Sequence, residues 1–454
     1  TVGIFQHMRE HVLIELEDRL GKNLDDNLII GATHTHSGPG RLIDAGGPFD
    51  LIADRFFPEF YLQMVDAMAD AVEEAYGDLQ PGRVGLTTMD VPEAVNDRRC
   101  EDGLDYVNAF SPMIVAEQNG QLASVLMTVP IHGTVLDISH RTLSSDVSGA
   151  IEYLVENQFD HPVSVMMMNS WGADMSPGDP TVVEQTGADQ PSGFDRMERV
   201  GVTVASDVLD ALDGIQWMED PAIWSKTGRV RIDRQAIGYD DETFLYEYGG
   251  VYCGSGLESD CETTTDFYGE FDDVCVPFSE EFAAPKQTLF TVGQLGDLHY
   301  FTFPGEPGTL LIESITAQLA EWQGIDEIMV VGYSQDYTGY SLLESDWWQG
   351  GYEASGALWG PQQGAYVSER LVDFFWHATT TWWPYMGPAP LAPFDAGAYS
   401  PYEPTTPINR GSVSQQVPSV IGETDTVVFT VSGSDPWLGT PLATLESEAG
   451  VTVM

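Results

Sequence analysis

The sequence predicts an α/β fold, in which helices pack on a large mixed sheet, followed by the start of a small β-domain. Short apolar runs typical of buried strands alternate with longer runs whose apolar residues recur at helical spacing. Beyond about residue 400 the helical pattern stops, and residues 415–430 alternate as a strand does. We therefore expect one large domain over residues 1–400, and a linker with a partial β-domain over residues 401–454.

Each predicted element follows from the spacing of its apolar residues. Apolar residues every three or four positions predict helices over residues 3–21, 50–79, 146–158, 194–212, 308–322 and 361–376. Compact or alternating apolar runs predict strands over residues 27–32, 83–88, 113–118, 121–129, 163–168, 229–234, 287–293, 299–303 and 327–332. Asn119-Gly120 is a turn signal that joins two of these strands into a hairpin. Pro58 interrupts the second helix, and residues 238–285 form a surface excursion.

Polar side chains directly follow several predicted strands. His34 and His36, His132 and Glu306 each come after an apolar run, and a tyrosine-rich loop follows residues 327–332. Alternate residues of a strand share a face, so His34 and His36 can point into one site. Functional groups of an α/β sheet gather where strands end. Two or three imidazoles with one carboxylate are the ligands of a catalytic zinc ion that keeps a position open for water.

The chain is strongly acidic, with a net charge of −53 from 18 basic and 71 acidic residues. Such a chain repels phosphate backbones, so we expect no nucleic-acid partner. The scattered acidic residues predict an acidic surface, which suits a high-salt environment because salt screens the self-repulsion. The alternative is that the carboxylates collect divalent cations, which allows a structural Ca²⁺ or Mg²⁺ ion.

The cysteines and the termini bear on the compartment. No apolar run is long enough to span a bilayer, and the chain opens at Thr1 without a leader, which leaves a signal peptide open. We expect two disulfides in a secreted, extracellular or periplasmic protein, with Cys253–Cys261 the most local pairing. An intracellular protein with four thiols is the alternative. A zinc ribbon is disfavoured, because no Cys-x-x-Cys pair occurs among Cys100, Cys253, Cys261 and Cys275.

Two other segments have both a structural and a functional interpretation. Arg98 and Arg99 form a cluster of guanidinium groups that either pairs with the plentiful carboxylates or contacts an anion in a site. Ser176 lies in a loop of small and polar residues after a buried strand. It has no Gly-x-Ser-x-Gly motif and no adjacent histidine, so the sequence does not support a conventional serine hydrolase triad.

Five motifs together resemble those of the neutral ceramidases, the neutral/alkaline, non-lysosomal amidases. Thr33-His34-Thr-His36-Ser-Gly-Pro-Gly closely resembles the family's Thr-His-Thr-His-Ser-Gly-Pro-Gly. The resemblance covers about residues 1–400. The other motifs follow in the family's order and are His132-Gly-Thr, Asp174-Met-Ser176-Pro177, Pro304-Gly-Glu306 and the block from Tyr340 to Tyr352-Glu-Ala-Ser.

The resemblance implies a zinc-dependent amidohydrolase that cleaves the N-acyl amide of ceramide into a sphingoid base and a fatty acid. It also implies transient contact with a membrane surface or micelles, and a carboxy-terminal immunoglobulin-like domain represented only from about residue 408. The implied zinc ligands are His34, His132, Glu306 and Tyr340. The implied catalytic residues are His36 as the acid/base beside the zinc-bound water, Tyr352 as the group that polarises the carbonyl, Arg98 and Ser176.

Departures from the family pattern keep some assignments open. Arg98-Arg99 stands where the family has Arg-Ser, so either arginine could enter the site. Tyr337 competes with Tyr340 as the metal ligand, and Ala173 splits the family's Gly-Asp pair. The family's opening glycine-rich strand has no counterpart before Thr1, which suggests a trimmed chain or a fragment.

Three alternative functions remain. The nearest is a zinc amidase of the same fold that acts on other N-acyl lipids or N-acyl amines. The second is a non-catalytic, acidic, cation-binding surface protein, which would bind many Ca²⁺ ions weakly and no stoichiometric Zn²⁺. The third is a serine hydrolase acting through Ser176, which would be insensitive to chelators.

Overall fold

The computed structural model describes residues 1–40, 42, 56–99, 110–136, 140, 142–178, 193–240, 242–251, 276–278, 286–378, 412–415 and 430–432. The chain divides into two compact units, Thr1–Ala392 and Pro393–Met454. Within the second unit the described residues form two antiparallel strands, β16 (Ser412–Gln415) and β17 (Thr430–Ser432). The rest of the predicted immunoglobulin-like domain lies outside the described residues, as do all four cysteines and therefore the predicted disulfides.

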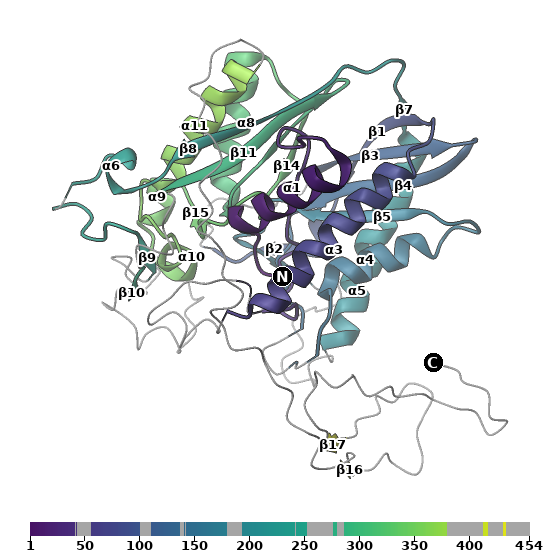
Figure 1. Cartoon of the computed structure of the whole chain (residues 1–454), viewed down its shortest axis with the longest axis horizontal. Coiled ribbons are helices and arrows are strands. Elements are labelled where there is room, and N and C mark those ends of the chain that lie inside the picture. Colours follow the sequence, from purple (N-terminus) through teal and green to yellow (C-terminus); the bar gives the residue numbers. More distant parts are fainter. Residues whose placement is uncertain are drawn as a thin grey trace. The chain divides into compact units, whose positions relative to one another are not determined.

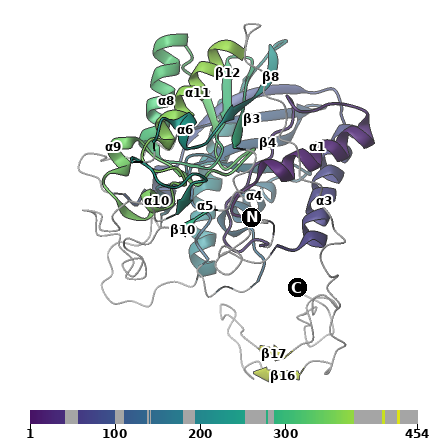
Figure 2. The ribbon, with the colours of Figure 1, turned by 60° about the vertical axis from the view of Figure 1, so that its left-hand side comes forward.

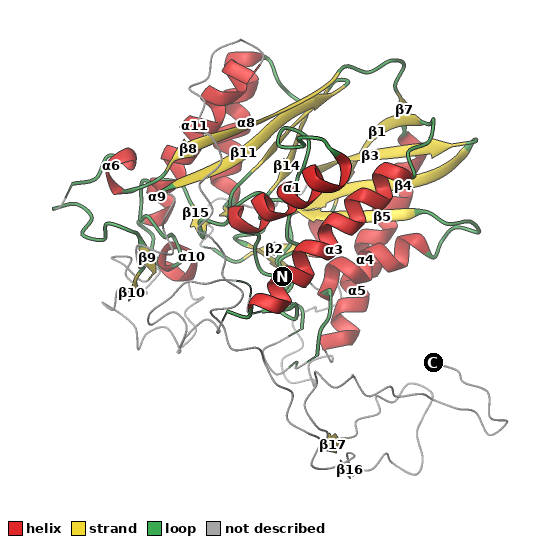
Figure 3. Cartoon of the chain, viewed as in Figure 1, coloured by secondary structure: helices red, strands yellow, loops and turns green. Residues whose placement is uncertain are grey.

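The first unit mixes helices and strands along the chain, which confirms the predicted α/β class (Figure 3). Its helices are α1 (Gln6–Leu20), α3 (Pro58–Gly77), α4 (Asp146–Glu156), α5 (Gly193–Ala211), α6 (Arg234–Ile237), α8 (Thr309–Gln323), α9 (Glu344–Trp347), α10 (Gly351–Ser355) and α11 (Gln363–Ala378). Its strands are β1 (Arg83–Asp90), β2 (Val95–Asp97), β3 (Phe110–Gln118), β4 (Gln121–Val129), β5 (Ser164–Asn169), β6 (Met175–Pro177), β7 (Gln216–Trp217), β8 (Ile223–Arg231), β9 (Gly250–Val251), β10 (Val276–Pro277), β11 (Gln287–Leu295), β12 (Leu298–Thr302), β13 (Glu306–Pro307), β14 (Ile328–Val331) and β15 (Tyr340–Ser341). Among the helices that the structure describes, none combines the length and apolarity needed to cross a membrane.

The strands form two main sheets, so the prediction of one large mixed sheet is wrong. One sheet has the order β5-β4-β3-β1-β7 and the other the order β14-β12-β11-β8. Both sheets are mixed, because β4 runs parallel to β5 and β12 runs parallel to β14, whereas the remaining neighbours are antiparallel. Pattern alone identifies strands but does not say which strands are neighbours.

Central strands such as β3 are apolar on both faces, which explains why the two sheets stack. In β3, Met113 and Val115 are buried in the core that contains the helices, whereas Ile114 packs against the cluster around Met329 of β14. Helices α4 and α5 cover the outer face of the five-stranded sheet, and α8 and α11 cover the four-stranded sheet (Figures 1 and 2). The result is four layers, with helices outside and the two sheets facing each other.

Several local predictions are confirmed and others need correction. The β3–β4 hairpin turns at Asn119 and Gly120, which both have positive φ, at 54° and 82°. Pro58 begins α3, where its missing N–H costs nothing because that group is unpaired in the first turn of a helix anyway. Most of the predicted helix before Pro58 lies outside the described residues. Residues 27–32 are not a strand, since they make a single bridge, from Gly31 to Ser334.

The strand ends of the two sheets meet at one seam. The Gly332 N–H, just after β14, donates to the Asn169 carbonyl at the end of β5 at 3.1 Å. The Ser170 hydroxyl donates to the Val330 carbonyl at 2.9 Å. The backbones are so close that a Cβ atom on Gly332 would lie 1.9 Å from the Ser170 carbonyl oxygen. The segments that follow β5 and β14 are therefore held side by side.

Candidate metal centre

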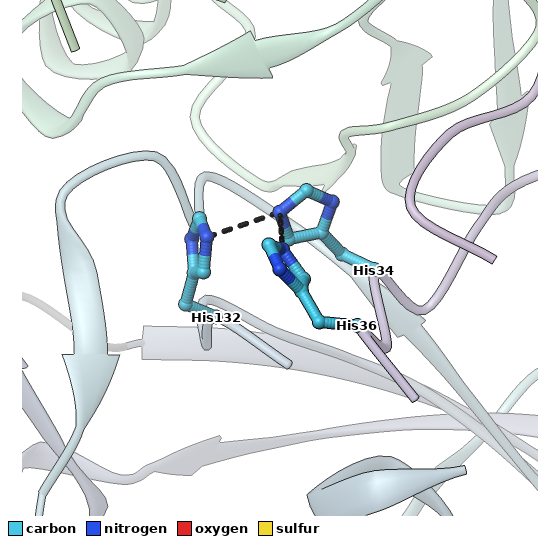
Figure 4. Close-up of side chains that lie close together, drawn as sticks. All are labelled: His34, His36 and His132. Carbon is cyan, nitrogen blue, oxygen red and sulfur yellow. Dashed lines mark hydrogen bonds between the residues drawn. The ribbon is translucent and has the colours of Figure 1, made fainter. Parts of the chain in front are cut away.

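Three histidines from two distant segments converge beside this seam (Figure 4). His34 Nε2 lies 3.0 Å from His132 Nε2 and 3.1 Å from His36 Nε2. One ligand atom from each histidine lies within 4.8 Å of the other two. His34 and His132 are buried and His36 is exposed, so the cluster is closed on its inner side and reachable from outside.

The hydrogen bonds of the two buried histidines fix their tautomers. His34 Nδ1 lies 2.6 Å from the Val2 carbonyl oxygen, and His132 Nδ1 lies 2.8 Å from the Gly172 carbonyl oxygen. A carbonyl only accepts, so both Nδ1 atoms carry the proton in the neutral rings. Both Nε2 atoms then present lone pairs toward each other, which is repulsive unless a cation lies between them. Metal-ligating histidines make this same contact from their other nitrogen.

The backbone at His34 explains how the two histidines of the motif share one site. His34 has a φ of 61°, in the left-handed region that non-glycine residues rarely adopt. The two side chains do lie together, as predicted, but strand alternation is not the reason, because His34 is not in an extended conformation. Tyr333 and Gln335, in the facing loop, also have positive φ, at 51° and 71°. Such backbone strain persists where surrounding contacts hold it, and it clusters at functional sites.

Glu306 brings a buried carboxylate to the histidines. Its Oε2 atom lies 3.4 Å from His34 Nε2 and 4.0 Å from His132 Nδ1. The Tyr333 hydroxyl donates to Oε2 at 3.3 Å, and the Tyr337 hydroxyl donates to Oε1. Tyr340 is the direct neighbour of Glu306, because β13 and β15 pair in parallel with these two residues in register. Both competing tyrosines therefore lie close to Glu306, Tyr337 on its Oε1 atom and Tyr340 beside it in the ladder.

Burial shifts the pKa values of this cluster toward the neutral forms. Desolvation lowers the pKa of His34 to about 3 and that of His132 well below its usual value. Although part of the His36 side chain is exposed, desolvation of its ring by neighbouring groups and then repulsion from His34 lower its pKa to about 4. Burial raises the pKa of Glu306 to about 7, against the opposing effects of the Tyr337 hydrogen bond and Arg98. The histidines are thus uncharged lone-pair donors at neutral pH.

Arg98 lies at the site, whereas Arg99 points away from it into the surrounding part of the same chain. Arg98 Nη2 lies 3.3 Å from the Tyr340 hydroxyl, and the guanidinium carbon lies 5.7 Å from the centroid of the Tyr352 ring. Arg99 instead bonds Asp346 and Glu353. Burial alone would lower the pKa of Arg98, but attraction to Tyr340, Glu353 and Glu306 outweighs it and raises the pKa.

The other two predicted site residues lie beside the cluster. Tyr352 is in α10, and its ring centroid is 5.5 Å from that of Tyr340. Ser176 is in β6, which pairs with β2 through Asn96, and its chain neighbour Met175 accepts a hydrogen bond from the His132 N–H at 2.8 Å. Within the described residues, the Ser176 side chain makes no hydrogen bond to the histidines or to Glu306.

The donor set fits a divalent metal ion. It offers two inward-facing imidazole lone pairs, a third imidazole at hand and a buried carboxylate. A cation at this point would relieve the facing lone pairs of His34 and His132 and favour the ionised form of Glu306. The geometry admits His36 as a third imidazole ligand, as well as the acid/base role that the resemblance implies.

Some contacts of the centre carry no sequence signal of their own. The carbonyls of Val2 and Gly172, which orient the histidines, are backbone groups, and neither lies in a histidine-bearing motif. The Tyr333 ring is tilted by 44° against the His34 ring, with centroids 4.4 Å apart, and its hydroxyl also donates to Glu306. Only its place in the tyrosine-rich loop after a predicted strand could have suggested it.

Comparisons with known proteins agree with the motifs. Residues 1–177 match the family model described as neutral/alkaline non-lysosomal ceramidase, N-terminal. A neutral ceramidase of Mycobacterium tuberculosis is 22% identical over 412 residues, which cover 78% of this chain and 64% of that protein. A neutral ceramidase of Pseudomonas aeruginosa is 28% identical over 174 residues, which cover 36% of this chain and 25% of that protein.

The fold has a solved counterpart. The crystal structure of neutral ceramidase from Pseudomonas aeruginosa superposes with a TM-score of 0.71 at 18% identity, over 94% of this chain and 74% of that chain. The likeness supports the α/β assignment. The chain spans less than two thirds of the length of the two curated relatives described above.

Proposed function

We propose that the chain, which matches the neutral/alkaline, non-lysosomal ceramidase family over residues 1–177, is a metal-dependent amidohydrolase that cleaves the N-acyl amide of ceramide. One observation carries the proposal. The family's two histidine motifs and its Pro-Gly-Glu motif, far apart in sequence, place their imidazoles and carboxylate within contact distance of one another. A second solved structure of similar fold is of a ceramidase complexed with C2, which supports a lipid amide as the substrate.

The residues that would hold the metal are His34, His132, Glu306 and Tyr340, and we propose zinc as the ion. Imidazole nitrogens and a carboxylate with an open position are the ligands of catalytic zinc sites. When bound, zinc supplies a Lewis acid that polarises a carbonyl and lowers the pKa of water to about 7. Tyr340 is preferred over Tyr337 because it is in register with Glu306 and contacts Arg98.

The side chains around the metal ligands supply proton transfer and charge stabilisation. His36 is neutral at pH 7 and exposed, so it can take a proton from water and pass it to the leaving amine. Arg98 and Tyr352 both lie next to Tyr340 and can donate to the developing oxyanion. One such donor is worth roughly 3 kcal/mol in the transition state. Ser176, on β6, is proposed as a further catalytic residue, as the resemblance implies.

Metal removal tests the proposed function most directly. We expect the purified protein to bind one zinc ion per chain and to release sphingoid base and fatty acid from a fluorescent ceramide. A chelator should abolish hydrolysis and stoichiometric zinc should restore it, because zinc provides several kcal/mol of transition-state stabilisation. Short N-acyl amines in the same assay separate a ceramidase from a general zinc amidase. Hydrolysis that survives complete metal removal would contradict the proposal.

Replacement of His36 by alanine separates its two possible roles. If it acts in proton transfer, His36→Ala should retain one metal ion per chain and lose about 10²–10⁴-fold in kcat. Metal content by mass spectrometry and kcat on the same preparation make the distinction. Loss of the ion would instead place His36 among the metal ligands, and a near-normal rate would exclude it from catalysis.

A further inference from the structure

We propose that Arg99 and Glu353 are positioning residues that hold the Arg98 guanidinium against the centre. This inference rests on the proposed function only where it concerns the rate of ceramide hydrolysis; the positioning of Arg98 itself does not depend on it. It concerns two buried residues for which the motifs imply no role. Arg99 is also a position where this chain departs from the family pattern.

Arg98 is held from three sides. Its Nε atom donates to Glu353 Oε1 at 2.7 Å, and its Nη2 atom donates to the Ala173 carbonyl at 2.6 Å. Its backbone N–H donates to the Asp174 carbonyl at 2.8 Å. These contacts leave Nη2 facing the Tyr340 hydroxyl at 3.3 Å. The Glu353 carboxylate thus sets the side-chain direction that gives Arg98 its place beside the site.

Glu353 is shared between the two arginines. One of its oxygens accepts from Arg98, and the other accepts from Arg99 Nη1 at 2.9 Å. The Glu353 side chain is only 6% exposed, so its carboxylate has little water to turn toward. Because Glu353 directly follows Tyr352 in α10, the same contact also fixes the segment that carries Tyr352.

Arg99 anchors that segment to the rest of the fold. Its Nε atom donates to Asp346 Oδ1 at 2.9 Å, and its Nη2 atom donates to the carbonyls of Asp346 and Gly350 at 2.9 and 3.1 Å. The planar guanidinium makes these directed bonds at once, which a lysine does not reproduce. Arg99 therefore ties α9 and α10 to the strand β2 that precedes Arg98.

The four charges balance within the buried network. Two guanidinium groups face the carboxylates of Glu353 and Asp346, both 6% exposed in their side chains. Loss of Arg99 leaves Glu353 with one partner and frees it to turn, and Arg98 turns with it. A displacement of about 1 Å at a reacting centre can lower the rate by roughly 10²-fold. The effect of Arg99 on the reaction should therefore pass through Arg98.

A double-mutant cycle on the zinc-loaded full chain tests this dependence. Arg98→Met, Arg99→Met and the double variant are compared by kcat for a fluorescent ceramide and by calorimetric Kd for laurate, a fatty-acid carboxylate. We expect Arg98→Met to lower kcat about 10²-fold, and Arg99→Met about 10-fold or more. The double variant should lie within about twofold of Arg98→Met alone, since coupled residues are not additive.

Arg83→Met provides the matched control. Arg83 pairs with Glu117 at 2.8 Å in an exposed position, with 52% of its side chain accessible. Combined with Arg98→Met, it should leave the rate of that single variant unchanged. If Arg99→Met does not fold, Arg99→Lys takes its place in the cycle, because lysine keeps the positive charge and lacks the several directed N–H donors of the planar guanidinium group.

The outcomes separate this inference from the proposed function. Independent effects of Arg98→Met and Arg99→Met would overturn the positioning role, as would an Arg99→Met protein with a lowered Tm and unchanged kcat and laurate Kd. A wild-type chain that cannot hydrolyse ceramide overturns the proposed function, and the cycle is then decided by the laurate Kd values. Failure of the wild-type chain to bind laurate in that case overturns the inference as well.

Discussion

The His34→Ala variant is expected to lose the bound metal ion and amide hydrolysis together. His34 is the centre of the cluster, since its Nε2 atom lies within 3.4 Å of His132, His36 and Glu306. Metal content should fall from about one ion per chain to near zero. The rate should fall roughly 10³-fold or more, because several kcal/mol of transition-state stabilisation leave with the metal.

The control for this variant replaces a histidine that is not part of the proposed metal centre. His377 lies in α11 and pairs with Asp373 of the same helix at 3.5 Å, so His377→Ala should keep both metal and rate. Both proteins are compared by mass spectrometry for metal and by fluorescent ceramide hydrolysis at saturating substrate. Stoichiometric zinc in His34→Ala would sink the ligand assignment.

The Gly332→Ala variant is expected to destabilise the fold and to damage the centre. Its Cβ atom would lie 1.9 Å from the Ser170 carbonyl oxygen, a backbone atom that cannot rotate away. The seam must open to admit the methyl group, and overpacking of this kind costs about 3 kcal/mol of unfolding free energy. The segments carrying Asp174 and Tyr333 move apart with it, so activity should fall further than stability at 25 °C explains.

Gly77→Ala is the matched glycine control. Gly77 ends α3, and a Cβ atom added there meets nothing within 4 Å. Its unfolding free energy should change by less than about 1 kcal/mol, toward greater stability. Urea unfolding of both variants gives the midpoints and slopes. Equal midpoints for the two variants would show that the seam is not tightly packed.

Much of the fold is predictable from the sequence because its elements have strong local signals. The helices α4, α5, α8 and α11 and the β3–β4 hairpin appear where apolar spacing and turn residues place them. The division into two sheets is not predictable in this way. A strand with two apolar faces can lie in a single sheet that has helices on both sides. It can equally lie in a sheet that has helices on one side and a second sheet on the other. The residues of the strand do not distinguish these two arrangements.

The candidate site was predictable in its members and not in its geometry. Polar residues after apolar strands, together with the motifs, identified His34, His132 and Glu306, and the structure brings these together. The left-handed backbone at His34 depends on contacts with a loop about 300 residues away, where Ala32 donates to the Tyr333 carbonyl at 2.9 Å. Local pattern does not encode such contacts. The division of labour between Arg98 and Arg99 likewise depends on Glu353 and Asp346.

The seam between the sheets also bears on how the protein folds. Ser170 and Val330 bond across a sequence separation of 160 residues, and the ligands His34 and Glu306 are still further apart in the chain. Contacts of such long range close late, since a large loop must be ordered before they form. A metal ion that binds only the assembled centre favours the docked sheets by mass action, at about 2.7 kcal/mol when its concentration is 100 times Kd. The ion would then stabilise the product of the last folding step, in addition to its role in the reaction.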